Sequence, residues 1–323
     1  MAFDFFWLTA GLLLLMVGGE TVVRGATGLA RALGVSPLVI GLTVVAFGTS
    51  APELAVNVIA AWEDRGDISF GNIIGSNMAN IGLIVGCTAI MRPLLITGVV
   101  IAREIPMMLL ATAAVVVMSF DGLLAPGTPD AIRRGEGIFL LLLFLVFLYY
   151  TVGDFVRQRT GNGNGELGRE FAPTDGGGAR HLIVTAVGLV ALVGGADLTV
   201  GAASNVARNF GVPEVIIGLT VLAVGTSLPE LVASVTATVR GHAELAIGNV
   251  VGSNIFNLLL VLGVTSLIRP IAIPAGGHLD LLMVGILSLL LFVVSLTANR
   301  RIIRGEAALL LAGYVGYIAW RAW

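Results

Sequence analysis

Ten long apolar stretches follow one another along this chain of 323 residues, and they constrain the fold more than any other feature. A helix needs roughly 20 mostly apolar residues to cross a bilayer. Charged residues make up only 12% of the chain, about half the share of a typical soluble protein. The sequence therefore predicts an all-α polytopic membrane protein with ten transmembrane helices, and it argues against a soluble enzyme or a disordered chain. The predicted spans are residues 5–30, 38–61, 73–91, 103–120, 137–156, 181–200, 215–239, 250–268, 279–297 and 307–320.

The arginines predict how these spans are oriented. The 18 basic residues are all arginine, and short cytoplasmic loops collect positive charge. If both termini lie outside, twelve arginines fall on the cytoplasmic side and six on the outer side. We therefore expect a multi-pass protein of the cell (inner) membrane with a cytoplasmic central loop. The net charge of −2 offers no basic surface for nucleic acid, and the sequence identifies no protein partner.

Two segments of the chain repeat each other at a constant offset of 177 residues. GLTVVAFGTSAPELAVNV (41–58) and GLTVLAVGTSLPELVASV (218–235) agree at 12 of 18 positions. The same offset aligns GNIIGSNMANIGLIVG (71–86) with GNVVGSNIFNLLLVLG (248–263), with 8 identities in 16 positions. Almost all of the polar residues in these segments agree, which lipid exposure alone would not favour.

The repeat predicts the organisation of the whole chain. Residues 1–156 form a first five-helix repeat, residues 157–180 a cytoplasmic linker loop, and residues 181–323 a second five-helix repeat. Because five is an odd number, the second copy must enter the membrane from the opposite side. Inverted repeats of this kind are typical of secondary transporters, whose binding sites lie near the bilayer midplane.

Glu53 and Glu230 occupy equivalent positions about midway along their spans. A charged side chain at the bilayer centre costs roughly 2.5–3.5 kcal/mol on insertion scales, so two such residues indicate a function. The alternative is a pair of protonated glutamates that hold helices together. Pro52 and Pro229 stand one residue before them and should break the second and seventh helices. The freed carbonyls, the neighbouring hydroxyls and the carboxylates would form an all-oxygen ligand set, which suits Ca²⁺ or another hard cation.

The third span of each copy adds further polar residues. Ser76 and Asn80 are four residues apart and therefore share one helix face, and Ser253 and Asn257 repeat this pattern. Helix packing is the other interpretation, because GxxxG pairs, Asn and Ser often join helices in membranes. We favour packing for the glycines and for the asparagines at positions 72 and 249. For Ser76, Asn80, Ser253 and Asn257 we favour ion coordination.

These motifs resemble the two alpha-repeats of the cation/Ca²⁺ exchanger superfamily, and most of all its prokaryotic Na⁺/Ca²⁺ exchanger branch. The resemblance is specific over residues 34–93 and 211–270, where GTSAPE and GTSLPE each precede GNxxGSNxxN. It implies that both glutamates bind Ca²⁺ or Na⁺ together. It also implies further ligands in the carbonyls of Ala46 and Ala223, the hydroxyls of Thr49, Ser50, Thr226, Ser227, Ser76 and Ser253, and the side chains of Asn80 and Asn257. Some members of the superfamily, including the K⁺-dependent branch, carry Asp at the position of Asn257, so K⁺ cotransport is not expected here.

The function predicted on these grounds is secondary active exchange of Na⁺ for Ca²⁺ by alternating access, with no cofactor and no enzymatic activity. Exchange of H⁺ for Ca²⁺ or another divalent cation is the main alternative, although the GNATE-like motif of proton-coupled relatives is missing. A cation channel and an intramembrane enzyme are further alternatives. Such an enzyme would have Ser50 or Ser227 as its nucleophile, without a histidine. Glu20 and Asp197 also correspond between the copies, and either a helix-end position or a role in ion access fits them.

Overall fold

The computed structural model describes residues 2–124, 127–159, 177–211 and 225–321. Within these ranges the protein is helical, and seven helices are long and apolar enough to cross a membrane. The number rises to eight if Pro37–Thr49 and Ala51–Trp62, which meet at an angle of 41°, form one broken span. The chain is thus an all-helical, multi-pass membrane protein. The count of ten spans stays a prediction, because residues 212–224 lie outside the described part.

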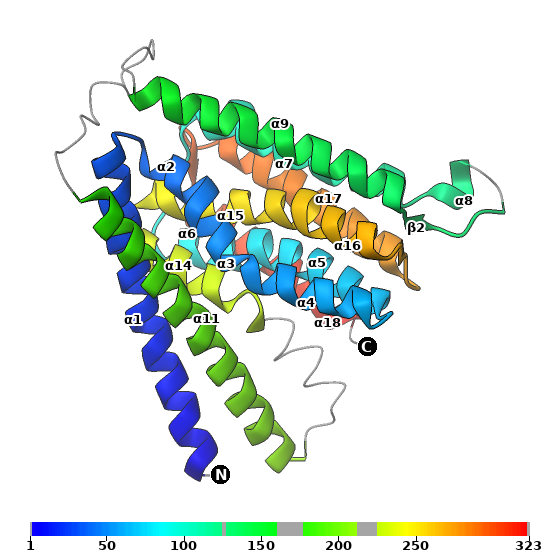
Figure 1. The fold of residues 1–323 in the computed structure, drawn as a ribbon, viewed down its shortest axis with the longest axis horizontal. Coiled ribbons are helices and arrows are strands. Elements are labelled where there is room, and N and C mark those ends of the chain that lie inside the picture. Colours follow the sequence, from blue (N-terminus) through cyan, green and yellow to red (C-terminus); the bar gives the residue numbers. More distant parts are fainter. Residues whose placement is uncertain (1, 125–126, 160–176, 212–224, 322–323) are drawn as a thin grey trace. The chain divides into compact units, whose positions relative to one another are not determined.

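The described residues form two compact units, and each unit combines segments from both halves of the chain. The first unit consists of residues up to Thr49 and from Gly153 to Val250. Figure 1 shows its two longest helices, α1 and α11, lying side by side. Their buried contact contains Leu15, Val22 and Leu192. The helices of this unit are α1 (Ala2–Leu33), α2 (Pro37–Ile40), η1 (Gly41–Val45), α3 (Ala46–Thr49), α11 (Gly178–Asn209), α14 (Leu228–Val239) and most of α15 (Ala243–Ile255).

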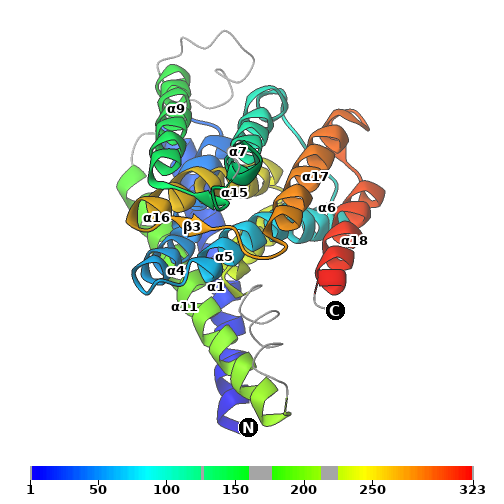
Figure 2. The same cartoon turned by 90° about the vertical axis from the view of Figure 1, so that its right-hand side faces the viewer.

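The second unit runs from Ser50 to Val152 and from Val251 to Arg321. Its core includes an aromatic cluster in which the ring of Phe144 lies 5.0 Å from that of Phe256. Figure 2 shows α17 beside α18 in this unit. Its helices are α4 (Ala51–Trp62), α5 (Gly66–Met78), η2 (Ala79–Val85), α6 (Gly86–Met91), η3 (Val100–Glu104), α7 (Ile105–Met118), α8 (Asp121–Leu124), most of α9 (Arg134–Arg159), η5 (Phe256–Val261), α16 (Leu262–Ile268), α17 (Gly277–Leu296) and α18 (Arg304–Arg321).

Glycines bring the backbones of α1 and α11 into contact. A Cβ atom added to Gly11 would lie 3.1 Å from the carbonyl oxygen of Gly195, and one added to Gly18 would lie 3.1 Å from that of Gly188. Residue numbers therefore rise along α1 while they fall along α11, so the two helices are antiparallel. These helices begin the two sequence repeats, and equivalent helices of the two copies thus run in opposite directions.

The repeated sequences form the same local structures. At the offset of 177 residues, the bounds of α4 match those of α14, and the bounds of α5 match those of α15. Ser50 and Ser227 precede the first pair with nearly equal backbone angles, φ −86° and ψ 2° against φ −91° and ψ 5°. The local fold is therefore set by the repeated residues and is reproduced when they recur.

Four two-residue strands, which the sequence does not suggest, occur in the second unit. β1 (Leu94–Leu95) pairs antiparallel with β4 (Arg301–Ile302), and β2 (Ala131–Ile132) pairs antiparallel with β3 (Ile271–Ala272). β1 and β3 both follow an Arg-Pro dipeptide, and a proline forces the residue before it into an extended conformation. Arg92 and Arg269 accordingly end their helices with φ near −147°. Each pair joins a strand of the first copy to a strand of the second.

Candidate functional site

The second predicted span is broken just before Pro52. α3 ends at Thr49, Ser50 caps the next helix, and Pro52 lies in the first turn of α4, where a missing N–H costs no helical hydrogen bond. The chain bends by 41° at this point. The predicted break of the second helix is therefore confirmed. In the second copy α14 begins in the same way at Leu228, and the residues before 225 lie outside the described part.

The spans that carry GNxxGSNxxN lie in the interior of the protein. In both Gly66–Met91 and Ala243–Ile268, 78% of the most apolar window is buried, whereas the other candidate spans bury 28–44%. Both spans also contain a π-helical segment, η2 and η5, which hold Asn80 and Asn257 respectively. Single π turns inside α-helices are frequent at functional sites. Both spans therefore have the burial expected of helices that line an internal site.

The second unit holds six of the predicted ligands, which come from both copies. Ser50 and Glu53 belong to the start of α4, and α4 packs against α5 and η5. The carboxyl group of Glu53 is buried, with 1% of the residue exposed. The other four predicted ligands of this unit are equally buried, and their side-chain oxygens have no hydrogen-bond partner among the described residues. These are Ser76, Asn80, Ser253 and Asn257.

The first unit holds a second set of predicted ligands. Glu230 is 1% exposed and lies in the first turn of α14. Ser227, which caps that helix, is also buried, and its hydroxyl has no hydrogen-bond partner among the described residues. Ala46 and Thr49 are fully buried, whereas Thr226 is half-buried. The last predicted ligand, Ala223, lies outside the described residues.

Buried polar groups that lack partners need a physical explanation. A hydroxyl or amide that is buried without a hydrogen bond costs about 1–3 kcal/mol, so such groups are rare in folded proteins. Here they recur at equivalent positions of two copies, Ser76 with Ser253 and Asn80 with Asn257. A cation coordinated by these oxygens would supply the missing interaction. The donor set consists of oxygen atoms, as hard cations prefer.

The structure also shows three side-chain hydrogen bonds that the sequence does not predict. Nδ2 of Asn57 donates to the backbone oxygen of Glu53 and to Oδ1 of Asn72, both at 2.7 Å. In the second copy the equivalent of Asn57 is Ser234, whose hydroxyl oxygen accepts a 3.0 Å hydrogen bond from Nδ2 of Asn249. Asn57 and Ser234 each lie 14 residues before the first glycine of GNxxGSNxxN, and nothing in the sequence marks this position as functional. Only the packing of neighbouring helices reveals them.

Glu104 is a further carboxylate within a candidate span and is fully buried in η3. Nε of Arg103 donates to Glu104 Oε1 at 2.8 Å, and the same guanidinium lies 4.6 Å from the centre of the Tyr150 ring. The second copy has Leu281 at the equivalent position, so this carboxylate does not belong to the repeated pattern. A carboxylate with a neighbouring arginine is explained by that ion pair.

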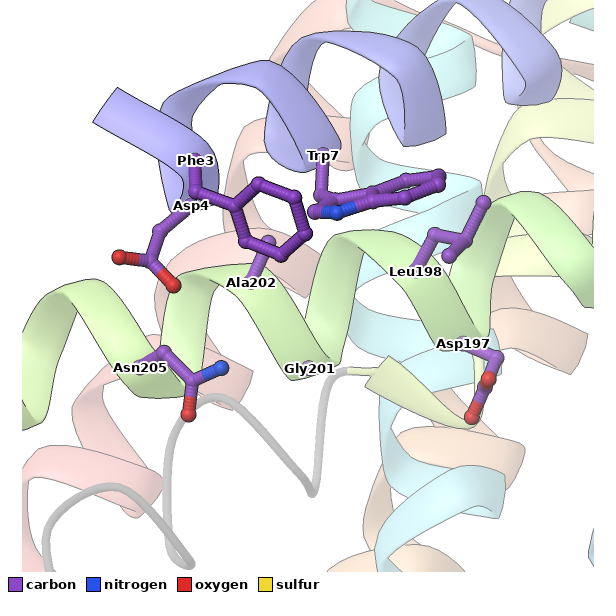
Figure 3. Close-up of a pocket in the computed structure, with 8 residues that line it drawn as sticks. All are labelled: Phe3, Asp4, Trp7, Asp197, Leu198, Gly201, Ala202 and Asn205. Atoms are coloured by element: carbon purple, nitrogen blue, oxygen red, sulfur yellow. The ribbon is translucent and has the colours of Figure 1, made fainter. Parts of the chain in front are cut away.

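Glu20 and Asp197, whose role the sequence does not decide, lie in different surroundings. Glu20 is bound by Arg24 at 2.6 Å and by Arg240 at 2.7 Å, so it joins α1 to the end of α14. Asp197 lines a pocket of about 270 Å³ between α1 and α11. In Figure 3 the rings of Phe3 and Trp7 lie over α11, with Asp4 and Asp197 at opposite ends of the row. Among the described residues, no predicted ligand lines this pocket.

The chain is similar to known proteins over nearly its whole length. A family model described as sodium/calcium exchanger protein matches residues 3–153 and 180–323. The inner membrane protein YrbG of Escherichia coli (strain K12) is 34% identical over 320 residues, which cover 98% of this chain and 96% of YrbG. Sodium/calcium exchanger MaX1 of Methanosarcina acetivorans is 31% identical over 340 residues, 98% of this chain and 97% of MaX1. A structure of the sodium-calcium exchanger NCX_Mj, soaked with zero Na⁺ and Ca²⁺, has a TM-score of 0.82 and 32% identity, with 98% of both chains covered.

Proposed function

Since this chain belongs to the sodium/calcium exchanger protein family, we propose that it is a secondary active antiporter that exchanges Na⁺ for Ca²⁺ across the membrane. Family membership makes it a cation/Ca²⁺ exchanger and not an enzyme. MaX1 and NCX_Mj are both named as exchangers of sodium and calcium, which supports Na⁺ as the counter-ion. The transported ions are substrates, and the function requires no cofactor.

The observation that carries this proposal is the repeated set of buried oxygen groups. Glu53 and Glu230 are each 1% exposed, and together they provide two negative charges, which match the charge of one Ca²⁺. The serine, threonine and asparagine oxygens of the predicted ligand set are neutral, so they replace water around the ion without adding charge. Na⁺ is a hard cation as well and can use the same oxygens. We propose that both carboxylates contribute to one ion site near the bilayer midplane.

Alternating access follows from the repeated architecture. The antiparallel arrangement of α1 and α11 and the exchange of strands between copies support two inverted five-helix repeats, residues 1–156 and 181–323. Inverted repeats are related by a pseudo-two-fold axis in the membrane plane, so exchanging the conformations of the two repeats converts a transporter open to one side into one open to the other. Empty carboxylates in a medium of low dielectric constant are costly, so the protein should change state only when cations occupy the site. That requirement couples the two ion fluxes.

The same proposal includes the orientation of the chain. The relative YrbG is named an inner membrane protein, which supports the cell membrane as the location. The distribution of arginines favours both termini outside and the loop of residues 157–180 in the cytoplasm. Cysteine labelling of a variant with a single cysteine placed at position 3 or at position 165, and Cys87 replaced, would test this orientation in intact cells.

Ion fluxes in proteoliposomes test the coupling. The purified chain is reconstituted into vesicles loaded with Na⁺, which are diluted into Na⁺-free or Na⁺-matched buffer containing radioactive Ca²⁺. We expect uptake only where Na⁺ can leave down its gradient, and an Na⁺ ionophore should abolish it. A second set of Na⁺-free vesicles carries a pH gradient in place of the Na⁺ gradient. Uptake driven by the pH gradient alone would identify an H⁺/Ca²⁺ exchanger, and uptake that ignores both gradients would identify a channel.

A further inference from the structure

A hydrogen bond within the first unit links the two sequence copies. Thr49 is the last residue of α3 in the first copy, and Asn249 belongs to α15 in the second copy. The hydroxyl of Thr49 donates to Oδ1 of Asn249 at 3.2 Å. Thr49 is fully buried and Asn249 is 1% exposed. Water therefore does not compete for this hydrogen bond.

The proton of Thr49 has a second acceptor within reach. Its hydroxyl lies 3.4 Å from the carbonyl oxygen of Ala46. A threonine hydroxyl has one proton but two lone pairs, so it can donate fully to only one of these acceptors. Donation to Ala46 would occupy a carbonyl that belongs to the predicted ligand set. Donation to Asn249 leaves that carbonyl available and turns the lone pairs of Thr49 away from Asn249.

Asn249 is fixed in the orientation that accepts this proton. Its Nδ2 donates to the hydroxyl of Ser234 at 3.0 Å and to the backbone oxygen of Glu230 at 3.4 Å. Rotating the amide by half a turn would place the NH₂ group against the Thr49 hydroxyl and an oxygen against the Glu230 carbonyl. The second of these contacts would be repulsive, so the donors hold Oδ1 toward Thr49.

Close backbone packing keeps Asn249 within hydrogen-bond distance of Thr49. A Cβ atom on Gly41 would lie 2.7 Å from the carbonyl oxygen of Leu245 and 3.2 Å from the backbone nitrogen of Asn249. A Cβ atom on Gly248 would lie 2.8 Å from the carbonyl oxygen of Leu38. Only glycine at both positions permits this approach between the helix that ends at Thr49 and α15.

We propose that Asn249 is a positioning residue for the ion site. It accepts the proton of the Thr49 hydroxyl, so that both this hydroxyl oxygen and the Ala46 carbonyl can coordinate the cation. Its amide also connects the first copy of the ligand motif to Glu230 of the second. This role rests on the proposed function, because it assigns a purpose to ligands of the same site. It replaces helix packing as the interpretation of Asn249.

Equilibrium binding of radioactive Ca²⁺ to the full chain in detergent tests the proposal with three variants. Asn249→Ala removes the acceptor and should weaken Ca²⁺ binding about fivefold, the effect of losing one ordinary hydrogen bond. Asn249→Asp keeps an acceptor for Thr49 but places an oxygen against the Glu230 carbonyl, so its Ca²⁺ affinity should fall less than that of Asn249→Ala. Ser234→Ala removes one acceptor of the Asn249 amide but leaves the other, the backbone oxygen of Glu230, and keeps the Thr49 contact, so it should change binding less than about twofold. A fall in Asn249→Asp equal to that in Asn249→Ala would overturn the proposal.

A double-mutant cycle with Thr49→Val separates this role from a purely structural one. If Asn249 acts through the Thr49 hydroxyl, Asn249→Ala should have little further effect on Ca²⁺ binding in the Thr49→Val background. An equal loss in both backgrounds would contradict the proposal. Competition by Na⁺ against bound Ca²⁺ is measured on the wild-type chain in parallel. If Na⁺ does not compete, the proposed Na⁺ coupling fails, while the comparison of the Asn249 variants remains valid because it measures Ca²⁺ alone.

Discussion

The side-chain amide of Asn57 on α4 donates a 2.7 Å hydrogen bond to Oδ1 of Asn72 on α5. The same amide also donates to the backbone oxygen of Glu53, again at 2.7 Å. Asn57 is fully buried. One side chain thus ties the helix that carries Glu53 to the helix that carries Ser76.

Replacing Asn57 by alanine should destabilise the protein. The change removes the two hydrogen bonds that the fully buried amide of Asn57 donates to Glu53 and Asn72, and the expected loss is about 1–3 kcal/mol. The melting temperature in detergent, followed by intrinsic tryptophan fluorescence, measures it. Asn209→Ala is the matched control, because Asn209 is exposed at the end of α11. Equal melting temperatures for the two variants would show that the contact contributes nothing to stability.

The glycine contacts between α1 and α11 make a separate prediction. A Cβ atom on Gly188 would lie 2.6 Å from the backbone nitrogen of Val22 and 3.1 Å from the carbonyl oxygen of Gly18. Gly188→Ala should therefore destabilise the protein by about 1–3 kcal/mol, since a backbone cannot move aside as a side chain can. Gly201→Ala on the same helix meets no atom within 4 Å and should be neutral or stabilising, because alanine favours helix. Thermal unfolding that is insensitive to Gly188→Ala would contradict the close packing.

The buried serines of the third spans should separate stability from binding. Ser76→Ala and Ser253→Ala remove hydroxyls that have no partner among the described residues, so neither should lower the melting temperature measured without ions. Both should weaken Ca²⁺ binding, by roughly tenfold for a change of about 1.4 kcal/mol. Ser288→Ala on α17 is the control, since its hydroxyl is also buried without a described partner. If Ser288→Ala weakens Ca²⁺ binding as strongly as Ser76→Ala, the serines of the motif have no special role.

Much of the fold can be predicted from the sequence because its causes are local. The break before Pro52 follows from the geometry of proline, and the match between α4 and α14 follows from a repeated sequence. The strands, the π-helical segments and the partners of Asn57 and Asn249 cannot be predicted in this way. They depend on which helices come into contact, and residues such as Leu94 or Ser234 have no sequence signal that distinguishes them from other apolar or small residues.

In the candidate site, too, some features can be predicted from the sequence and others depend on tertiary packing. The cost of placing Glu53 and Glu230 in a membrane identifies them from the sequence alone. Glu104 has the same cost, but its neighbour Arg103 offsets the charge, and only the structure shows that this residue is fully buried. The hydrogen bonds that orient the ligands belong to tertiary packing. These hydrogen bonds therefore cannot be predicted from a pattern in the sequence.

The central claim is that Glu53 and Glu230 carry the exchanged cations. It is tested most directly by Na⁺-driven uptake of radioactive Ca²⁺ into proteoliposomes containing wild-type protein, Glu53→Gln, Glu230→Gln or Glu63→Gln. Glu63 is an exposed carboxylate that follows α4 and pairs with Arg65 at 3.0 Å, so it controls for the loss of a negative charge near the same helix. We predict uptake by wild-type protein and Glu63→Gln, and the level of protein-free vesicles for the other two variants. Near wild-type uptake by either Glu53→Gln or Glu230→Gln would contradict the claim.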